Sequence, residues 1–107
     1  MSRDTFMKAL TAEGVPCAAG YSQPLQKMPY LADAFQTKTF RAIYPEKMLD
    51  FNAYKRNNEC PESDKLCLEE NVRFTQNLLL GSKSDMDDIA RAIEKIHQNA
   101  GKLKNAN

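Results

Sequence analysis

Residues 60–96 read CPESDKLCLEENVRFTQNLLLGSKSDMDDIARAIEKI, and this stretch contains the clearest secondary-structure signals of the chain. The Cys60-Pro61 pair predicts a helix over residues 61–71, because proline suits a first helical turn whose N–H groups have no partner within the helix. Apolar and polar side chains then alternate through much of residues 72–80, which is the periodicity of a strand. Gly81 follows and is expected to end that strand.

A second helix is expected over residues 85–99. Ser84 would be its N-cap, with Asp87 three residues later completing a capping box. Gly101 would end the helix, and residues 102–107 would form a frayed tail. The residues at helical spacing that would form its apolar stripe are Met86, Ile89, Ile93 and Ile96.

The first half of the chain carries weaker signals. Residues 4–13 predict a helix with Gly14 just past its end, residues 15–21 a short strand, residues 22–30 a proline-containing loop and residues 30–36 a short helix. Residues 37–59 follow neither period. We expect a strand or a single helical turn around 39–51, lying against the rest of the chain or against a missing surface, and the aromatic residues between 40 and 54 would form part of a surface for a partner.

This succession of elements predicts an α+β fold. A small, mainly antiparallel sheet would be covered on one face by the first and last helices. The length of 107 residues fits a single domain over residues 1–107.

Composition and charge argue against several classes of protein. The net charge of +1, without a basic stripe, argues against a nucleic-acid partner. No apolar run is long enough to span a bilayer and no signal pattern is present, so we expect no membrane partner and a cytoplasmic location. The odd number and wide spacing of Cys17, Cys60 and Cys67 fit neither a disulfide framework nor a zinc site, so no metal ligands are expected.

Several short motifs follow one another in an order that is typical of one enzyme family. They are Cys60-Pro61, the QNLLLG run at 76–81, the DMDDI run at 85–89, Lys95-Ile96 and, upstream, Gly20-Tyr21, Pro24-Leu25 and Met28-Pro29. Together they resemble the C-terminal end of the DegT-type (DegT/DnrJ/StrS) sugar aminotransferases, which depend on pyridoxal phosphate (PLP). The resemblance extends over about residues 6–96.

The resemblance implies a fold, a reaction and a partner. The chain would be the C-terminal small domain of a fold type I PLP enzyme, a fragment of a longer, homodimeric aminotransferase. The parent would transfer an amino group from glutamate or glutamine to a keto-sugar or keto-cyclitol, with this domain as a cleft wall or lid. The family's Schiff-base lysine and phosphate-binding parts lie in the large domain, its missing partner here. No catalytic or cofactor-binding residue is therefore expected in this chain, and alone it should be inactive. The alternative is a stand-alone, non-catalytic interaction or regulatory module of the same fold.

Four polar residues are candidates for contact with a substrate in the cleft. Tyr21 could present its hydroxyl to the cleft or pack its ring on the edge of the core. Arg73 could pair with a substrate carboxylate, or stay solvated or paired with Glu70. Gln76 is expected on the apolar face of the strand with its amide bonded to neighbouring backbone, and Asn77 on the opposite face, toward a cleft or a turn.

Overall fold

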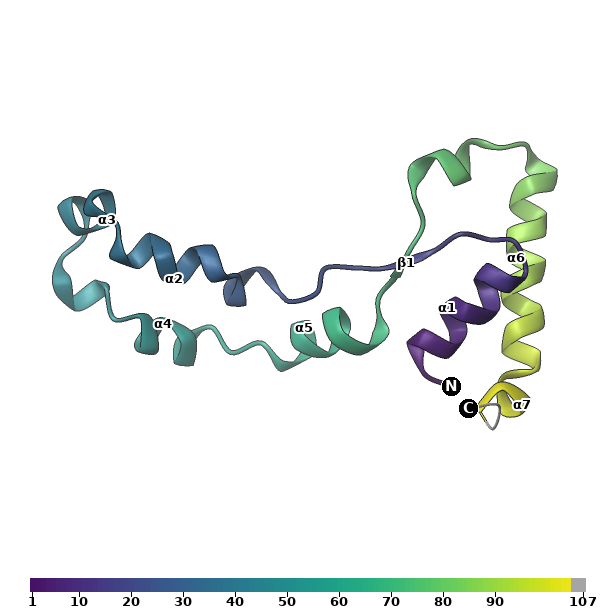
Figure 1. Ribbon diagram of the computed structural model, residues 1–107, viewed down its shortest axis with the longest axis horizontal. Coiled ribbons are helices and arrows are strands. Elements are labelled where there is room, and N and C mark those ends of the chain that lie inside the picture. Colours follow the sequence, from purple (N-terminus) through teal and green to yellow (C-terminus); the bar gives the residue numbers. More distant parts are fainter. Residues whose placement is uncertain (105–107) are drawn as a thin grey trace. The chain divides into compact units, whose positions relative to one another are not determined.

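The computed structural model describes residues 1–104, and the chain divides into two compact units. One unit consists of Met1–Gly20 and Glu69–Asn107, and we call it the terminal unit. The other consists of Tyr21–Leu68, and we call it the central unit. The described structure is mostly helical and contains one two-stranded antiparallel sheet, which agrees with the α+β class in its coarse form (Figure 1).

The terminal unit combines two packed helices with the short sheet. Its elements are α1 (Arg3–Ala12), β1 (Ala18–Ala19), β2 (Val72–Arg73), the 3₁₀ helix η4 (Gln76–Leu80), α6 (Lys83–Gln98) and α7 (Ala100–Lys104). The two strands are antiparallel, with Ala18 opposite Arg73 and Ala19 opposite Val72. α1 packs against α6, and the core of the unit lies at that contact.

The core of the terminal unit is small. Leu10 of α1 is completely buried, and it packs with Val15 and with Ala92 and Ile96 of α6. The residues that pack around these four while keeping partial exposure are Phe6, Ala9, Cys17, Phe74, Leu78, Ile89, Ile93 and Leu103. The apolar stripe predicted for the last helix is therefore confirmed at three of its four positions, with Met86 half-buried at the N-terminal end.

Gly14 allows the chain to turn back over α1. Its φ of +86° lies in the left-handed region that residues with a Cβ rarely adopt, as the sequence predicted for a residue just past a helix. The Gly14 N–H donates to the Thr11 carbonyl at 3.0 Å, and the Val15 N–H donates to the Leu10 carbonyl at 3.1 Å. This turn directs Val15 back into the core beside Leu10.

The strand predicted over residues 72–80 is wrong for most of its length. Only Val72–Arg73 is extended and paired, because β1 offers a partner of just two residues in place of the predicted 15–21. Residues 76–80 instead form η4, whose first turn is closed by the Leu78 N–H donating to the Thr75 carbonyl at 3.1 Å. Phe74 and Leu78 both pack against the core, and their spacing of four residues fits one face of a strand as well as one face of a helix, so it did not distinguish the two.

The last helix starts two residues earlier than predicted. Ser82 is its N-cap and Asp85 completes the capping box: Ser82 Oγ accepts from the Asp85 N–H at 3.3 Å, and the Ser82 N–H donates to Asp85 Oδ2 at 2.7 Å. The predicted box of Ser84 and Asp87 is wrong, since both lie inside the helix and Asp87 pairs with Lys83 at 2.8 Å. Both serines are followed three residues later by an aspartate, so sequence spacing alone did not separate them.

The end of the chain also differs from its prediction. α6 ends at Gln98, where the Asn99 side chain donates to the Lys95 carbonyl at 2.9 Å. Gly101 lies within α7 and does not end α6. Of the predicted frayed tail, residues 102–104 are helical, and residues 105–107 lie outside the described residues.

Replacement of Ser82 by alanine tests the corrected helix start. We expect Ser82→Ala to destabilise the terminal unit by about 1 kcal/mol, because the Asp85 N–H loses its acceptor. Urea unfolding followed by helical circular dichroism measures this loss. The matched control is Ser84→Ala, which removes the same atoms inside the helix and should leave stability unchanged or slightly raised, since alanine is the better helix former. Equal losses from the two variants would contradict the assignment of Ser82 as the cap.

The same variant should also change the titration of Asp85. Hydrogen bonds from the Ser82 hydroxyl and, next, from the Ser82 N–H hold the pKa of Asp85 below its ordinary value of 3.8. A lowered folded-state pKa means that the carboxylate stabilises the fold above its unfolded pKa, and that this contribution is lost as the pH falls through the folded value. In Ser82→Ala the pKa of Asp85 should move back toward 3.8, which a carboxyl NMR titration detects.

The central unit consists of short helices. They are η1 (Leu25–Lys27), α2 (Pro29–Gln36), α3 (Lys38–Ile43), η2 (Glu46–Met48), α4 (Phe51–Asn57) and α5 (Pro61–Lys65). The short helix predicted over 30–36 is confirmed. The residues around 39–51 contain α3 as well as the single turn η2, so a strand there is excluded. The helix predicted over 61–71 starts correctly at Pro61 but changes after Lys65 into a π-helical turn, η3 (Leu66–Glu70).

An aromatic cluster holds the central unit together. The Phe35 ring of α2 lies 5.3 Å from the Phe51 ring, 5.3 Å from the Tyr54 ring and 6.2 Å from the Phe40 ring, measured between centroids. All four rings keep partial exposure, and within Tyr21–Leu68 only Pro24 is buried. The aromatic surface predicted between residues 40 and 54 is thus divided: Phe40, Phe51 and Tyr54 pack inward, whereas Tyr44 is exposed.

Over residues 1–104, no helix has the length and apolar character needed to cross a bilayer.

Candidate functional site

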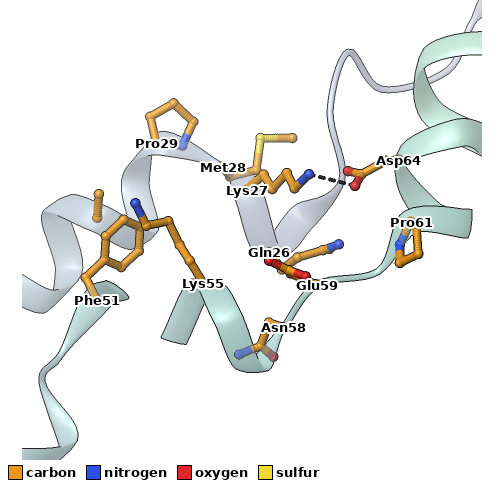
Figure 2. A pocket seen from close by; sticks show the side chains of 11 residues that line it. Gln26, Lys27, Met28, Pro29, Phe51, Lys55, Asn58, Glu59, Pro61 and Asp64 are labelled. Carbon is orange, nitrogen blue, oxygen red and sulfur yellow. Dashed lines mark hydrogen bonds and ion pairs between the residues drawn. The ribbon is translucent and has the colours of Figure 1, made fainter. Parts of the chain in front are cut away.

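A cavity of about 500 Å³ lies in the central unit (Figure 2). One side comes from η1 and the start of α2, and the other from α4, α5 and the loop between them. The residues that line it are Gln26, Lys27, Met28, Pro29, Ala32, Phe51, Lys55, Asn58, Glu59, Pro61 and Asp64. Its volume is in the usual range of about 300–1,000 Å³ for small-molecule sites.

An ion pair fixes one part of the cavity wall. Lys27 Nζ on η1 lies 2.6 Å from Asp64 Oδ2 on α5, and Figure 2 shows this pair spanning the two sides. The Asp64 side chain is one-quarter exposed, so the pair is shielded more than an ordinary surface pair. It ties together segments that are 37 residues apart in the sequence.

The apolar part of the wall is held by the aromatic cluster. Phe51 stacks on Tyr54 with centroids 5.7 Å apart and meets Phe35 edge to face, so its ring is fixed before any ligand arrives. Lys55 Nζ lies 5.3 Å from the centroid of the Phe51 ring, which is a cation–π distance.

Hydrogen-bonding capacity remains open at the cavity. Gln26 Nε2 is buried and has no partner, although a buried donor of this kind normally has one. Among the described residues, no ion pair involves Glu59 or Lys55. Asn58, in contrast, is held by its own helix, since its side-chain amide donates to the Tyr54 carbonyl at 2.8 Å.

The four residues predicted to meet a substrate do not line this cavity. Tyr21 is 68% exposed at the start of the central unit, so its ring does not pack on a core. Arg73, Gln76 and Asn77 all lie in the terminal unit and are exposed. The expectation that Gln76 lies on a buried apolar face is therefore wrong, because η4 replaces the strand that would have placed it there.

Asn77 does line a second, shallower depression of about 460 Å³ in the terminal unit. Its acidic residues already have partners: Glu13 pairs with Lys95 at 2.8 Å, Asp88 pairs with Arg91, and Asp85 caps α6. Across residues 1–104, no three His, Cys, Asp or Glu side chains come together in a group able to hold a metal ion. The depression therefore offers a polar surface and little unmatched charge.

The residues of the larger cavity were missed by the sequence analysis. Gln26, Lys55 and Glu59 come from segments about thirty residues apart, and no local spacing relates them. Near them, the sequence analysis used Met28-Pro29 and Cys60-Pro61 as family motifs and Pro61 as a helix start, and neither use pointed to a cavity.

The cavity does not fit PLP. A PLP site needs an available lysine amine and a cluster of N–H or hydroxyl donors around the phosphate. Here Lys27 is paired with Asp64, Lys55 lies over the Phe51 ring, and α2 and α5 both begin with a proline, which removes an N–H from the first turn. The Glu59 carboxylate would in addition repel a phosphate.

The described residues thus provide a small-molecule-sized cavity with an open donor and acceptor in the central unit, and a separate set of exposed polar residues in the terminal unit. No protein-family model, curated protein or solved structure matches this chain, so its resemblance to the sugar aminotransferases rests on the order of its sequence motifs.

Proposed function

We propose that this chain is the C-terminal small domain of a DegT-type, PLP-dependent aminotransferase, in which it forms a wall or lid of the substrate cleft. The parent transfers an amino group from glutamate or glutamine to a keto-sugar or keto-cyclitol. The observation that carries the proposal, beside the motif order, is the exposure of large apolar side chains on the central unit. Those exposed there are Tyr21, Leu25, Tyr30, Ile43, Tyr44, Met48, Leu66 and Leu68.

This exposure supports a missing covering surface. A unit of this size depends on buried apolar area for stability, yet Leu25 and Ile43 are both more than 60% exposed. Covering one such side chain fully is worth about 1.5–3 kcal/mol. A larger domain packed on this unit would supply that stabilisation, and a small domain held against a cofactor domain is what the proposed parent requires.

The contribution of this chain to the reaction is then to shape and close the cleft. The cofactor supplies an electron sink when it is bound by the large domain. The wall formed by this chain excludes water and positions the substrate. Arg73 is suited to bind a carboxylate through its planar guanidinium, and Tyr21, Gln76 and Asn77 offer neutral hydrogen-bonding groups. All four are exposed and accessible to a partner.

The proposal is tested with the chain alone and with the chain joined to the cofactor domain of its reading frame. The chain alone, mixed with PLP and borohydride, should show no lysine carrying the reduced cofactor by peptide mass spectrometry. The joined protein should transfer an amino group from glutamate or glutamine to a keto-sugar. Trapping of a lysine in this chain would overturn the division of roles, and an inert joined protein would overturn the proposed reaction.

The same exposed side chains also favour a second candidate, a stand-alone interaction or regulatory module. Both functions require a protein partner, and they differ in whether that partner is covalently continuous with this chain. A cofactor-binding reading frame that runs directly into residue 1 supports the first function. A separate gene whose product is captured by other proteins supports the second.

A further inference from the structure

We propose that the cavity of the central unit binds a small, uncharged molecule that carries a primary amide on an aromatic or similarly apolar body. The proposal does not depend on the aminotransferase assignment, because all the residues involved lie within Tyr21–Leu68. It rests on three properties of the cavity: its open hydrogen-bonding groups, its charge balance and its fixed aromatic wall.

The unpaired side chains of Gln26 and Glu59 favour a ligand that carries one hydrogen-bond acceptor and one donor. Gln26 Nε2 is a buried donor without a partner, so a ligand oxygen that it meets when the side chain turns into the cavity would satisfy it. The Glu59 carboxylate also lines the cavity and can only accept, so a ligand N–H beside it would be favoured. A primary amide presents a carbonyl oxygen and an NH₂ group in one plane and satisfies both side chains at once.

The charge balance favours a ligand without net charge. Lys27 and Asp64 neutralise each other in their ion pair. Lys55 and Glu59 contribute one positive and one negative charge, so the lining as a whole has no excess of either sign. Outside that ion pair, a carboxylate or phosphate ligand would meet one lysine and one carboxylate, so the lining gives an anion no net attraction to offset the cost of burying its charge.

The remaining wall suits an apolar body. Phe51 is fixed by its contacts with Tyr54 and Phe35, and Pro29 at the start of α2 adds apolar surface to the lining, as Figure 2 shows. A flat ring placed against these groups would remove apolar surface from water without ordering mobile side chains, which is the property of a preformed site.

Three isosteric probes test the hydrogen-bonding pattern on the full chain. Benzamide offers a donor and an acceptor, benzoate offers only acceptors and a charge, and benzamidinium offers only donors and a charge. In titrations followed by NMR, benzamide should shift the side-chain NH₂ signals of Gln26 in a saturable manner. Benzoate and benzamidinium should bind at least fivefold more weakly. Equal binding of benzoate, or shifts that map outside the cavity, would overturn the proposal.

Variants of the two open groups separate a specific role from a loss of structure. Gln26→Leu and Glu59→Gln should each weaken benzamide binding at least tenfold. The matched controls Gln98→Leu and Glu62→Gln change exposed residues that do not line the cavity and should bind as the parent chain does. Gln26→Glu keeps the shape of the side chain but turns the donor into an acceptor, so it should reverse the preference from benzamide to benzamidinium. A general loss of binding to all three probes in Gln26→Glu would contradict the assigned pattern.

Discussion

Replacing Leu10 by alanine is expected to lower the free energy of unfolding of the terminal unit by about 2–5 kcal/mol, the usual cost of emptying a fully buried leucine site. Leu10 is the one side chain of the described residues that is large and completely buried, and it lies where α1 meets α6. Because the buried core has only four members, the neighbours have few ways to close the resulting cavity. Chemical unfolding, with backbone hydrogen exchange of α6 as a local probe, measures the loss.

Leu79→Ala is the matched control for that prediction. Leu79 lies in the same unit, on η4, and is 49% exposed. The same change of side chain there should alter stability by only about 0.5 kcal/mol, because little packing is removed. If the two variants had similar effects, the contact of α1 with α6 would not be the core of this unit.

The elements that the sequence predicted correctly are those with a local physical cause. Gly14 follows from the need for a positive φ after α1, and the start of α5 at Pro61 follows from the fixed φ and missing N–H of proline. The stripe on α6 follows from helical spacing of isoleucines, and no knowledge of the rest of the chain is needed to find it.

The errors come from features that tertiary contacts decide. The alternation after Val72 was compatible with a strand, but a strand needs a partner, and β1 supplies only two residues. Ser82 and Ser84 have equivalent capping patterns. Ser82 is the cap because η4 ends at Leu80 and α6 begins at Lys83. Propensity and spacing contain neither piece of information.

The cavity could not be predicted from the sequence for the same reason. Its ion pair joins Lys27, near the start of the central unit's sequence, to Asp64, near its end. Gln26 stands out only because its buried Nε2 has no hydrogen-bond partner. In sequence, each of these residues is an ordinary polar side chain. The four residues predicted as cleft contacts were chosen from a strand and a loop next to motifs, and the structure leaves them on the surface.

The aromatic cluster gives the second large effect that we expect, in the central unit. Phe35→Ala should destabilise this unit by about 2–3 kcal/mol, toward the low end for phenylalanine because the ring keeps partial exposure. Phe35 contacts the rings of Phe40, Phe51 and Tyr54, so its removal leaves α2, α3 and α4 without a common contact. Amide exchange should lose protection across these helices while α6 keeps its own.

Tyr30→Ala on the same helix separates this effect from a general sensitivity of α2. Tyr30 is 58% exposed and belongs to the apolar surface that we assign to a partner, so its removal should leave the isolated chain nearly as stable. Once the partner domain is present, Tyr30→Ala should weaken the contact between the domains. Binding of the partner should restore part of the stability that the central unit loses in Phe35→Ala. A central unit that unfolds equally in both variants would show that the exposed side chains already stabilise the chain by itself, which would remove the main structural argument for a missing covering domain.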